Sequence, residues 1–219
     1  RYGAVAGLDA ATEELTLSRD RSFTFAIDAM DADETGQTLT AASALARQLR
    51  EVVIPEIDGY VFGKMCTGAG TKPAAAELTA ANIYGEILKA GAALDAAEVP
   101  ETGRQLLVTP ETLLLMKQSG DIVLETDIGA DLRLKGVISN LDGANVIRVP
   151  ASRVPEGFGF LLAHPSATVA PVKLESYNTH QNPPGINGQL VEGRVVYDAF
   201  VLENKKMALY YQAVPTEEA

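Results

Sequence analysis

The sequence predicts an α+β fold, and three observations support this prediction. Residues 14–28 alternate between apolar and polar side chains, which is typical of a half-buried β-strand. A long stretch after residue 35 carries apolar residues at steps of three and four, the period of an amphipathic helix. A strand, a long helix and then mixed short elements follow one another in that order, which indicates an α+β fold.

The alternating stretch is rich in aromatic and β-branched residues. One face carries Leu15, Leu17, Phe23, Phe25 and Ile27, and the other carries Thr16, Ser18, Ser22 and Thr24. The Gly-rich and Ala-rich residues 1–14 before it are predicted to form an exposed loop.

The long helix is predicted from Thr35 to Met65. Its apolar stripe consists of Leu39, Ala42, Leu45, Leu49, Val52, Val53, Ile57, Tyr60 and Val61. Capping groups and negative charge near its start come from Asp31, Asp33, Glu34 and Thr35. At the rise of an α-helix it would span roughly 45 Å, which is long for a globular protein.

Pro55 lies inside this helix. Proline has no backbone donor and its ring pushes against the carbonyl four residues earlier, here that of Glu51. We therefore expect a bend or break near this point. The apolar stripe keeps its phase through Ile57 and Val61, which favours one kinked helix over two separate helices.

The rest of the chain is predicted to contain short elements. Residues 66–77 form a loop, and a helix runs from about Thr79 to Glu98 with Thr79 as N-cap. Its apolar side carries Ile83, Ile87, Leu88, Ala92 and Leu94. The later elements are a strand in "RQLLVTP", a helix in "ETLLLMKQSG" closed by Gly120, two strands around an Asp-Gly turn in "LKGVISNLDGANVIRVP", an apolar strand region in "GFGFLLAHPSATVAPVKL", and two strands joined by a polar turn in "GRVVYDAFVLENKKMALYYQAV". No internal repeat or low-complexity linker separates independent domains.

Composition narrows the function classes. The chain has 219 residues, 47 % of them hydrophobic, which is typical of a globular protein. The net charge of -11 without a basic cluster argues against binding to DNA or an anionic membrane through a basic face. No apolar run approaches the length of a membrane span. Cys66 is the single cysteine, which predicts no intrachain disulfide and a reducing compartment.

Residues able to carry chemistry are few. His164 and His180 have no second ligand at metal-binding spacing, and we interpret both as structural or exposed. Cys66 lacks a histidine partner and is interpreted as a small buried or semi-exposed thiol and not as a nucleophile. Glu56 and Asp58 are two residues apart and therefore point in different directions on a helix.

Two segments superficially match ligand-binding loops. Residues 31–42 have acidic residues and Gly36 at the sixth position of a calcium loop, but Ala42 stands where a bidentate glutamate is required. "GAGTKP" has Pro73 in place of the serine or threonine of a phosphate-binding loop and follows a helix instead of a strand. The sequence predicts no catalytic, cofactor-binding or metal-binding residue, no cofactor and no enzymatic activity.

Four longer phrases carry a resemblance to a known family. They are "LTLSRDRSFTFAID", "ALARQLREVVIPEIDGYVFGKM", "LTAANIYGEILKAGAALDAAEVPETGRQLLVTPETLLLMK" and "GRVVYDAFVLENKKMALYY". In the same order, along nearly the whole chain, they resemble the major capsid proteins of tailed bacteriophages and prophages. These proteins have the Hong Kong 97-type capsid fold.

The resemblance implies a domain organisation. Residues 1–28 would form the second limb of an E-loop hairpin and the strand that follows it. Residues 29–71 and 172–200 would form a peripheral domain with the long helix as its spine. Residues 72–171 and 201–219 would form an axial domain with a central sheet and flanking helices.

The resemblance also implies a function. The chain would be a structural protein that assembles into the pentamers and hexamers of an icosahedral shell around double-stranded DNA, without sequence-specific contact to the DNA. Its partners would be other copies of itself, a scaffolding protein and a portal, but no membrane. It would be assembled in the host bacterial cytoplasm and reside in the virion capsid. The alternatives are the shell protein of an encapsulin-type bacterial nanocompartment and, from another class, a small soluble enzyme that gathers His164 or His180 with carboxylates in a pocket.

Two departures from the family pattern lead to further expectations. Family members usually have some tens of residues before the position of Arg1, which form an N-terminal arm and the first E-loop limb. We therefore expect residues 1–219 alone to form few or no shells. Residues 1–28 contain no lysine, so the E-loop crosslink of some relatives is not expected from this segment.

Overall fold

A computed structural model describes residues 14–34, 40–120 and 140–216 of the chain. Its elements in chain order are β1 (Arg19–Asp28), α1 (Ala29–Glu34), α2 (Ala41–Gln48), η1 (Leu49–Val53), α3 (Ile54–Gly68), α4 (Ile83–Ala96), β2 (Gln105–Val108), α5 (Pro110–Gln118), β3 (Asn140–Leu141), β4 (Ala144–Arg148), η2 (Ala151–Arg153), β5 (Phe158–Ala163), η3 (Pro165–Ala167), β6 (Thr168–Val169), β7 (Val172–Gln181), β8 (Gly188–Tyr197), β9 (Phe200–Val201), η4 (Lys206–Ala208) and β10 (Leu209–Ala213). The mixture of helices and strands confirms the predicted α+β class.

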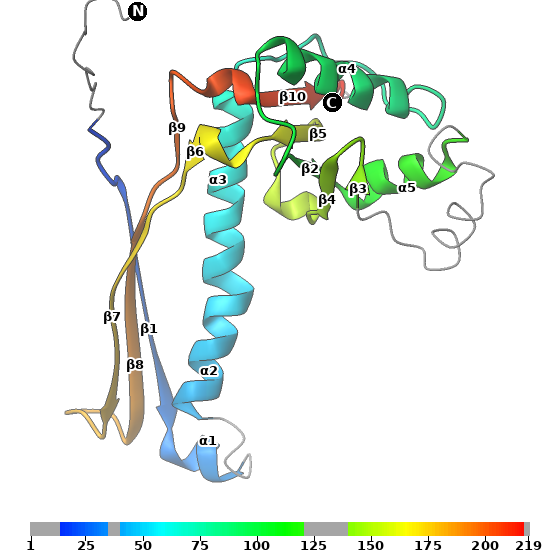
Figure 1. Cartoon of the computed structure of the whole chain (residues 1–219). Coiled ribbons are helices and arrows are strands. Elements are labelled where there is room, and N and C mark those ends of the chain that lie inside the picture. Colours follow the sequence, from blue (N-terminus) through cyan, green and yellow to red (C-terminus); the bar gives the residue numbers. More distant parts are fainter. Residues whose placement is uncertain (1–13, 35–39, 121–139, 217–219) are drawn as a thin grey trace, which may run out of the picture.

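The molecule has an elongated part and a compact part (Figure 1). The elongated part consists of the antiparallel sheet β1-β8-β7 and the continuous helix α2–η1–α3 beside it. The compact part consists of the sheet β10-β5-β2-β4-β3 with helices α4 and α5. A short pair, β6 with β9, lies between the two sheets.

The predicted strand near the N-terminus is confirmed by β1. It pairs with β8 over its full length, from Arg19 opposite Tyr197 to Asp28 opposite Gly188. Phe23, Phe25 and Ile27 are more buried than their neighbours, as the alternation predicts. A small cluster forms where Ile27 meets Val191 of β8 and Ala41 of α2, so the sheet and the long helix pack together at this end.

The long helix begins later than the sequence predicts. Thr40 is extended, its side-chain oxygen accepts a hydrogen bond from the Ser43 amide, and the helix therefore starts at Ala41. The acidic residues expected to cap it lie mainly in the separate short helix α1, whose first turn contains Asp31. The helix continues past Met65 to Gly68, and its length is about 40 Å.

Pro55 lies in one continuous helix, which confirms the prediction of a single element. Leu49–Val53 forms a π turn, in which the Ile54 amide donates to the Leu49 carbonyl five residues earlier. Gln48, Val53 and Ile54 all keep right-handed helical dihedrals. The wider turn accommodates the proline ring without a break in the helix, and Figure 1 shows none.

The sheet of the compact part is covered on both faces. One face packs against α4 and α5 through a cluster that contains Ile83, Ile87, Leu94, Leu106, Val108, Met116, Phe160, Leu162 and Tyr210. The other face packs against the end of α3 through Cys66, Ala69, Leu107, Leu161, Ala163 and Leu209. Every residue of β5 is buried, as expected for a central strand with an unbroken apolar sequence.

Other predictions are confirmed or corrected in detail. Asp142 and Gly143 have positive φ between β3 and β4, which confirms the Asp-Gly turn. The second helix starts at Ile83 instead of Thr79, because Asn82 holds the preceding turn by accepting from the Thr79 amide. Gly120 lacks the positive φ of a helix-closing glycine.

The C-terminal prediction of two linked strands also changes. The β8 strand lies in the three-stranded sheet and β10 in the five-stranded one, so the two belong to different parts of the molecule. Gly36 of the calcium-loop comparison, the loop predicted over residues 1–13 and residues 134–139 of the predicted strand pair lie outside the described residues.

Candidate assembly surface

Asp198 is the most heavily hydrogen-bonded carboxylate between the strands and the long helix. Its side chain accepts from the Ser18 amide (2.8 Å), the Ser18 hydroxyl (2.7 Å), the Tyr60 hydroxyl (2.9 Å) and the Ala199 amide (2.8 Å). The residue is only 3 % exposed. Because it joins the start of β1, the helix α3 and the end of β8, it ties the three segments together.

The hydrogen bonds around Asp198 determine its charge. Burial by itself would raise the pKa of this carboxyl, but the hydrogen bonds from Ser18, Ala199 and Tyr60 outweigh burial and lower the pKa to about 2. The group is therefore ionised at neutral pH. No motif marks this residue in the sequence, and the one signal that could indicate it is its position as a single acid within the apolar run "VVYDAFVL".

Aromatic residues surround this junction. The ring of Tyr60 meets Tyr197 edge-on, with centroids 5.6 Å apart. The Arg19 guanidinium lies 4.6 Å from the centre of the Tyr60 ring, a cation–π contact. These contacts attach the middle of the long helix to the end of the three-stranded sheet.

Glu56 and Asp58 take part in ion pairs within the chain. Glu56 accepts from Arg21 of β1 at 2.6 Å and from the Tyr197 hydroxyl at 3.1 Å. Asp58 accepts from Arg153 of η2 at 2.7 Å. The two carboxylates point in different directions, as predicted, and each is a partly exposed member of an ion pair within the chain.

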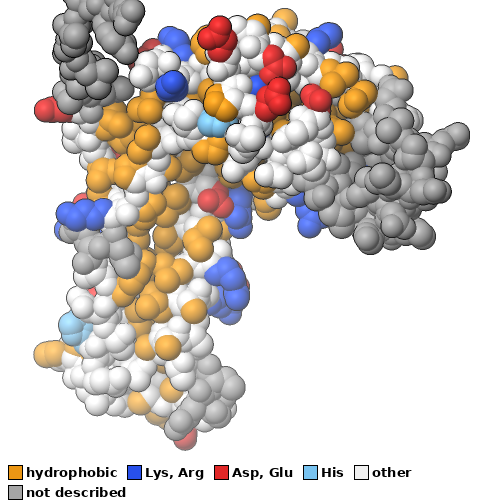
Figure 2. Space-filling model, viewed as in Figure 1, with side chains coloured by type: hydrophobic (Ala, Val, Ile, Leu, Met, Phe, Trp, Pro, Cys, Tyr) orange, Lys and Arg blue, Asp and Glu red, His pale blue; other side chains and the backbone are white. Residues whose placement is uncertain are grey.

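Apolar side chains are exposed along the elongated part. Figure 2 shows hydrophobic side chains running over much of this part of the visible face. On the long helix, Val52 and Ile54 are each 47 % exposed. Among the described residues of both parts, the other large exposed apolar side chains are Leu15, Met30, Leu88, Leu114, Ile147, Val169, Val172 and Met207. From Leu49 to Met65, no residue of the long helix is fully buried.

Val52 also lines a shallow groove between the long helix and the sheet. Its volume is about 220 Å³, and it is lined by Phe25, Ala44, Arg47, Gln48, Glu51 and Val52. Arg47 and Arg50 both pair with Glu51 at its rim. The groove thus has an apolar floor and a charged border, which is a common arrangement at protein–protein interfaces.

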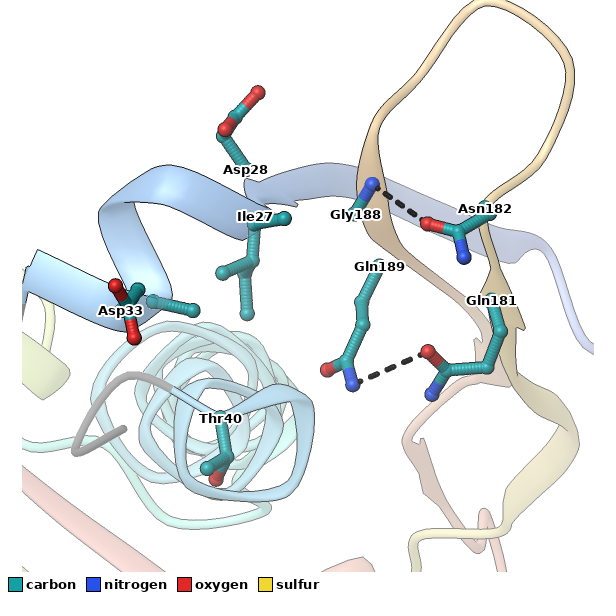
Figure 3. Close-up of a pocket in the computed structure, with 10 residues that line it drawn as sticks. Ile27, Asp28, Asp33, Thr40, Gln181, Asn182, Gly188 and Gln189 are labelled. Atoms are coloured by element: carbon teal, nitrogen blue, oxygen red, sulfur yellow. Dashed lines mark hydrogen bonds between the residues drawn. The ribbon is translucent and has the colours of Figure 1, made fainter. Parts of the chain in front are cut away.

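A more polar pocket lies at the end of the three-stranded sheet (Figure 3). It has a volume of about 370 Å³ and is lined by Ile27, Asp28, Ala29, Ala32, Asp33, Thr40, Gln181, Asn182, Gly188 and Gln189. Gln189 donates to Gln181, and the Gly188 amide donates to Asn182, so these amides fix the ends of β7 and β8. The lining contains no histidine or cysteine and offers no general base and nucleophile in one place.

The two histidines lie in different parts of the molecule. The ring of His164, which follows β5, contacts the Ser166 hydroxyl and the Thr102 carbonyl. His180, on β7, contacts Glu192 at 3.0 Å, and both side chains are more than 40 % exposed. Hydrogen bonds from His180 and Asn178 lower the pKa of Glu192. Neither histidine lines one of the pockets described above.

The remaining ligand-binding motifs are used structurally. The Gly70 amide donates to the Lys206 carbonyl, and Lys72 donates to the Thr67 carbonyl, so the "GAGTKP" segment packs against its own chain. Among the described residues, His, Cys, Asp and Glu side chains do not gather in a group able to hold a metal ion. Within the same residues, no helix has both the length and the apolar character needed to cross a membrane.

Cys66 is expected to be unreactive in the folded protein. The residue is 2 % exposed, and burial raises the pKa of its thiol to about 12. Because a thiolate is the reactive form, a disulfide reagent at pH 8 should label less than about one tenth of the native protein within minutes and nearly all of the urea-unfolded protein. Rapid labelling of the native chain would contradict this prediction.

Comparisons with known proteins identify the fold. No family model matches the sequence, and no curated protein matches it either. The capsid structure of the cyanophage P-SCSP1u matches at a TM-score of 0.72, with 12 % identity, over 98 % of this chain and 81 % of that chain. A structure from Mycobacterium phage Che8 matches at 0.70, with 20 % identity, over 89 % and 70 %. A virus-like particle from Pyrococcus furiosus matches at 0.57, with 11 % identity, over 89 % and 76 %.

These matches extend over both the elongated and the compact part of the molecule. The long helix beside a three-stranded sheet and the two-sided five-stranded sheet are therefore a shared architecture. The chain has the Hong Kong 97-type capsid fold.

Proposed function

We propose that this chain is the major capsid protein of a tailed phage or prophage, which assembles into pentamers and hexamers of an icosahedral shell around double-stranded DNA. The observation that carries the proposal is the exposure of apolar side chains on the elongated part. No residue of its long helix is fully buried from Leu49 to Met65, and Val52 and Ile54 are each 47 % exposed. Contacts between copies would bury this surface, and the fold shared with phage capsid structures supports such an arrangement.

The proposed domain organisation follows the same division. Residues 29–71 and 172–200 form the peripheral domain, residues 72–171 and 201–219 the axial domain, and residues 1–28 the E-loop limb with its strand. Support comes from β10, which lies in one sheet with β5 and β2 although its sequence follows the peripheral strands. The contacts between Asp198 and Ser18 support a close link between β1 and the peripheral domain.

Partners and location follow from a shell role. Other copies of the chain are the principal partner, and a scaffolding protein and a portal are further partners. The net charge of -11 supports packaged DNA that is enclosed without being tightly held by the shell wall. The protein would be assembled in the host bacterial cytoplasm and reside in the virion, with a structural and not a catalytic role.

The direct test is to express the full reading frame that contains this chain, with and without its scaffolding partner, and to examine the product by negative-stain electron microscopy. Closed shells tens of nanometres across are expected. A monodisperse monomer under all of these conditions would overturn the proposal.

The exposed apolar residues on the long helix provide a sharper test. The double variant Val52→Asp with Ile54→Asp should remain folded, because both side chains are half exposed, but its yield of closed shells should fall at least about tenfold, since charges would be buried at the contact. Circular dichroism and sedimentation measure the two effects. Gln118→Asp, an added charge at an exposed polar position on α5, is the control and should assemble normally.

A bacterial nanocompartment shell is the second candidate. The structural match to the virus-like particle from Pyrococcus furiosus supports it, but the TM-score is lower than for the phage P-SCSP1u capsid. The contents of purified shells distinguish the two candidates. Packaged DNA supports the phage capsid, and an enclosed cargo protein supports the compartment.

A further inference from the structure

Asp198 lies where four segments of the chain meet. Its carboxylate binds Ser18 ahead of β1, Tyr60 of α3 and the Ala199 amide ahead of β9. Its own amide donates to the carbonyl of Pro171, immediately before β7 (3.2 Å). Figure 1 shows β1, β7 and β8 converging in this region before β9 and β6 continue toward the compact part.

Ser18 is held unusually firmly for a residue outside a sheet. Its amide and its hydroxyl both donate to Oδ2 of Asp198, at 2.8 and 2.7 Å. Hydrogen bonds to a charged acceptor are about twice as strong as those between neutral groups. The first strand pair of β1 is Arg19 with Tyr197, so this double hydrogen bond lies immediately outside the end of the ladder.

A groove lies beside the same segment a short distance upstream. Leu15 lines a groove of about 270 Å³ whose other lining residues are Lys64, Thr67, Gly68, Ala199, Phe200, Val201 and Glu203. Residues 14–18 have no strand partner among the described residues. The hydrogen bonds between Ser18 and Asp198 are therefore the contacts that hold this segment, because no backbone ladder does.

We infer that Asp198 is a positioning residue, which through Ser18 fixes the path of residues 14–18 ahead of β1 and so the contacts that this segment makes with a neighbouring copy. This inference rests on the proposed shell function. The carboxylate is well suited to the role, because it is buried, ionised and bound to the rigid helix α3 through Tyr60. The Ser18 hydroxyl is the group that can be removed with the least effect on the core.

The first test measures amide hydrogen exchange in residues 14–18 of the protein before it is assembled into shells. In Ser18→Ala, the amide at position 18, which donates to Asp198, should exchange about three- to tenfold faster, because the hydroxyl bond that also holds this residue on Asp198 is lost. Ser18→Thr restores the hydroxyl and should exchange as the unchanged chain does. Thr16→Ala removes an exposed hydroxyl two residues away and is the matched control. Equal exchange in Ser18→Ala and Thr16→Ala would overturn the inference.

The second test measures assembly. Ser18→Ala should yield several-fold fewer uniform closed shells and more open or misshapen ones, while the melting temperature of the dissociated chain changes by no more than about 4 °C. Ser18→Thr should restore uniform shells, and Thr16→Ala should retain them. Normal shells from Ser18→Ala would refute the inference and leave the proposed function intact. Absence of shells from the unchanged protein would refute the proposed function, and the exchange experiment would still decide whether Asp198 holds this segment.

Discussion

Replacing Gly188 with alanine is expected to reduce the free energy of unfolding by about 2–5 kcal/mol. Gly188 begins β8 with a φ of +151°, a conformation that side-chain-bearing residues rarely adopt. A Cβ atom there would lie 2.1 Å from the Ile27 carbonyl oxygen, which belongs to the backbone of β1 and cannot rotate away. The substitution must therefore separate the ends of β1 and β8.

Gly185→Ala is the matched control for this prediction. Gly185 lies in the same β7–β8 connection and also has positive φ, but a Cβ there would meet no heavy atom within 4 Å. The substitution should therefore lower the free energy of unfolding by only about 1 kcal/mol, the cost of placing a side-chain-bearing residue at positive φ. Urea unfolding of the dissociated chain, followed by circular dichroism, gives both values. Equal losses in the two variants would show that the contact with Ile27 is not the cause.

Replacing Asp198 with alanine is expected to reduce the free energy of unfolding by about 3 kcal/mol. The change removes the carboxylate that accepts four hydrogen bonds. The donors of Ser18, Tyr60 and Ala199 then lose their acceptor at a position where Asp198 is only 3 % exposed. The same unfolding experiment measures the loss. Asp58→Asn is the control, since its ion pair with Arg153 is partly exposed and should contribute less than about 1 kcal/mol.

The stabilisation by Asp198 should also depend on pH. Its folded-state pKa of about 2 lies below the ordinary value of 3.8, so the unfolded chain binds the proton more readily. The stabilisation of the fold by ionised Asp198 is present above about pH 4, and it is lost as the pH falls from about 4 to 2. Asp198→Asn removes the titrating group, so the stability difference between this variant and the unchanged chain should narrow over this interval. A constant difference from pH 5 to pH 2 would contradict the assignment.

Features set by local sequence were predictable. The alternation around Phe23 and Phe25 gave β1, and the stripe that keeps its phase past Pro55 gave a single long helix. The unbroken apolar run of β5 indicated a buried strand. In each of these the order of apolar and polar side chains along the chain matches the face that is buried, and a periodic pattern records that order.

The contacts of the candidate site were not predictable in the same way. Ser18 and Asp198 are 180 residues apart, and Arg21 and Glu56 are 35 apart. No periodicity or motif records which distant polar groups will meet, so the partners of Glu56 and Asp58, Arg21 and Arg153, could not be identified from the sequence. The start of the long helix was also misplaced, because the cap at Thr40 competes with several earlier acidic residues that could serve as well.

The π turn at Leu49–Val53 has a consequence for related sequences. A hydrogen bond that spans five residues instead of four encloses one additional amino acid, while the helix on either side continues undisturbed. A relative with a regular α-helix here would thus need one residue fewer between Ala41 and Gly68 to present the same faces to the sheet. When such relatives are aligned, we expect a one-residue gap within this turn, accompanied by loss of the proline at position 55.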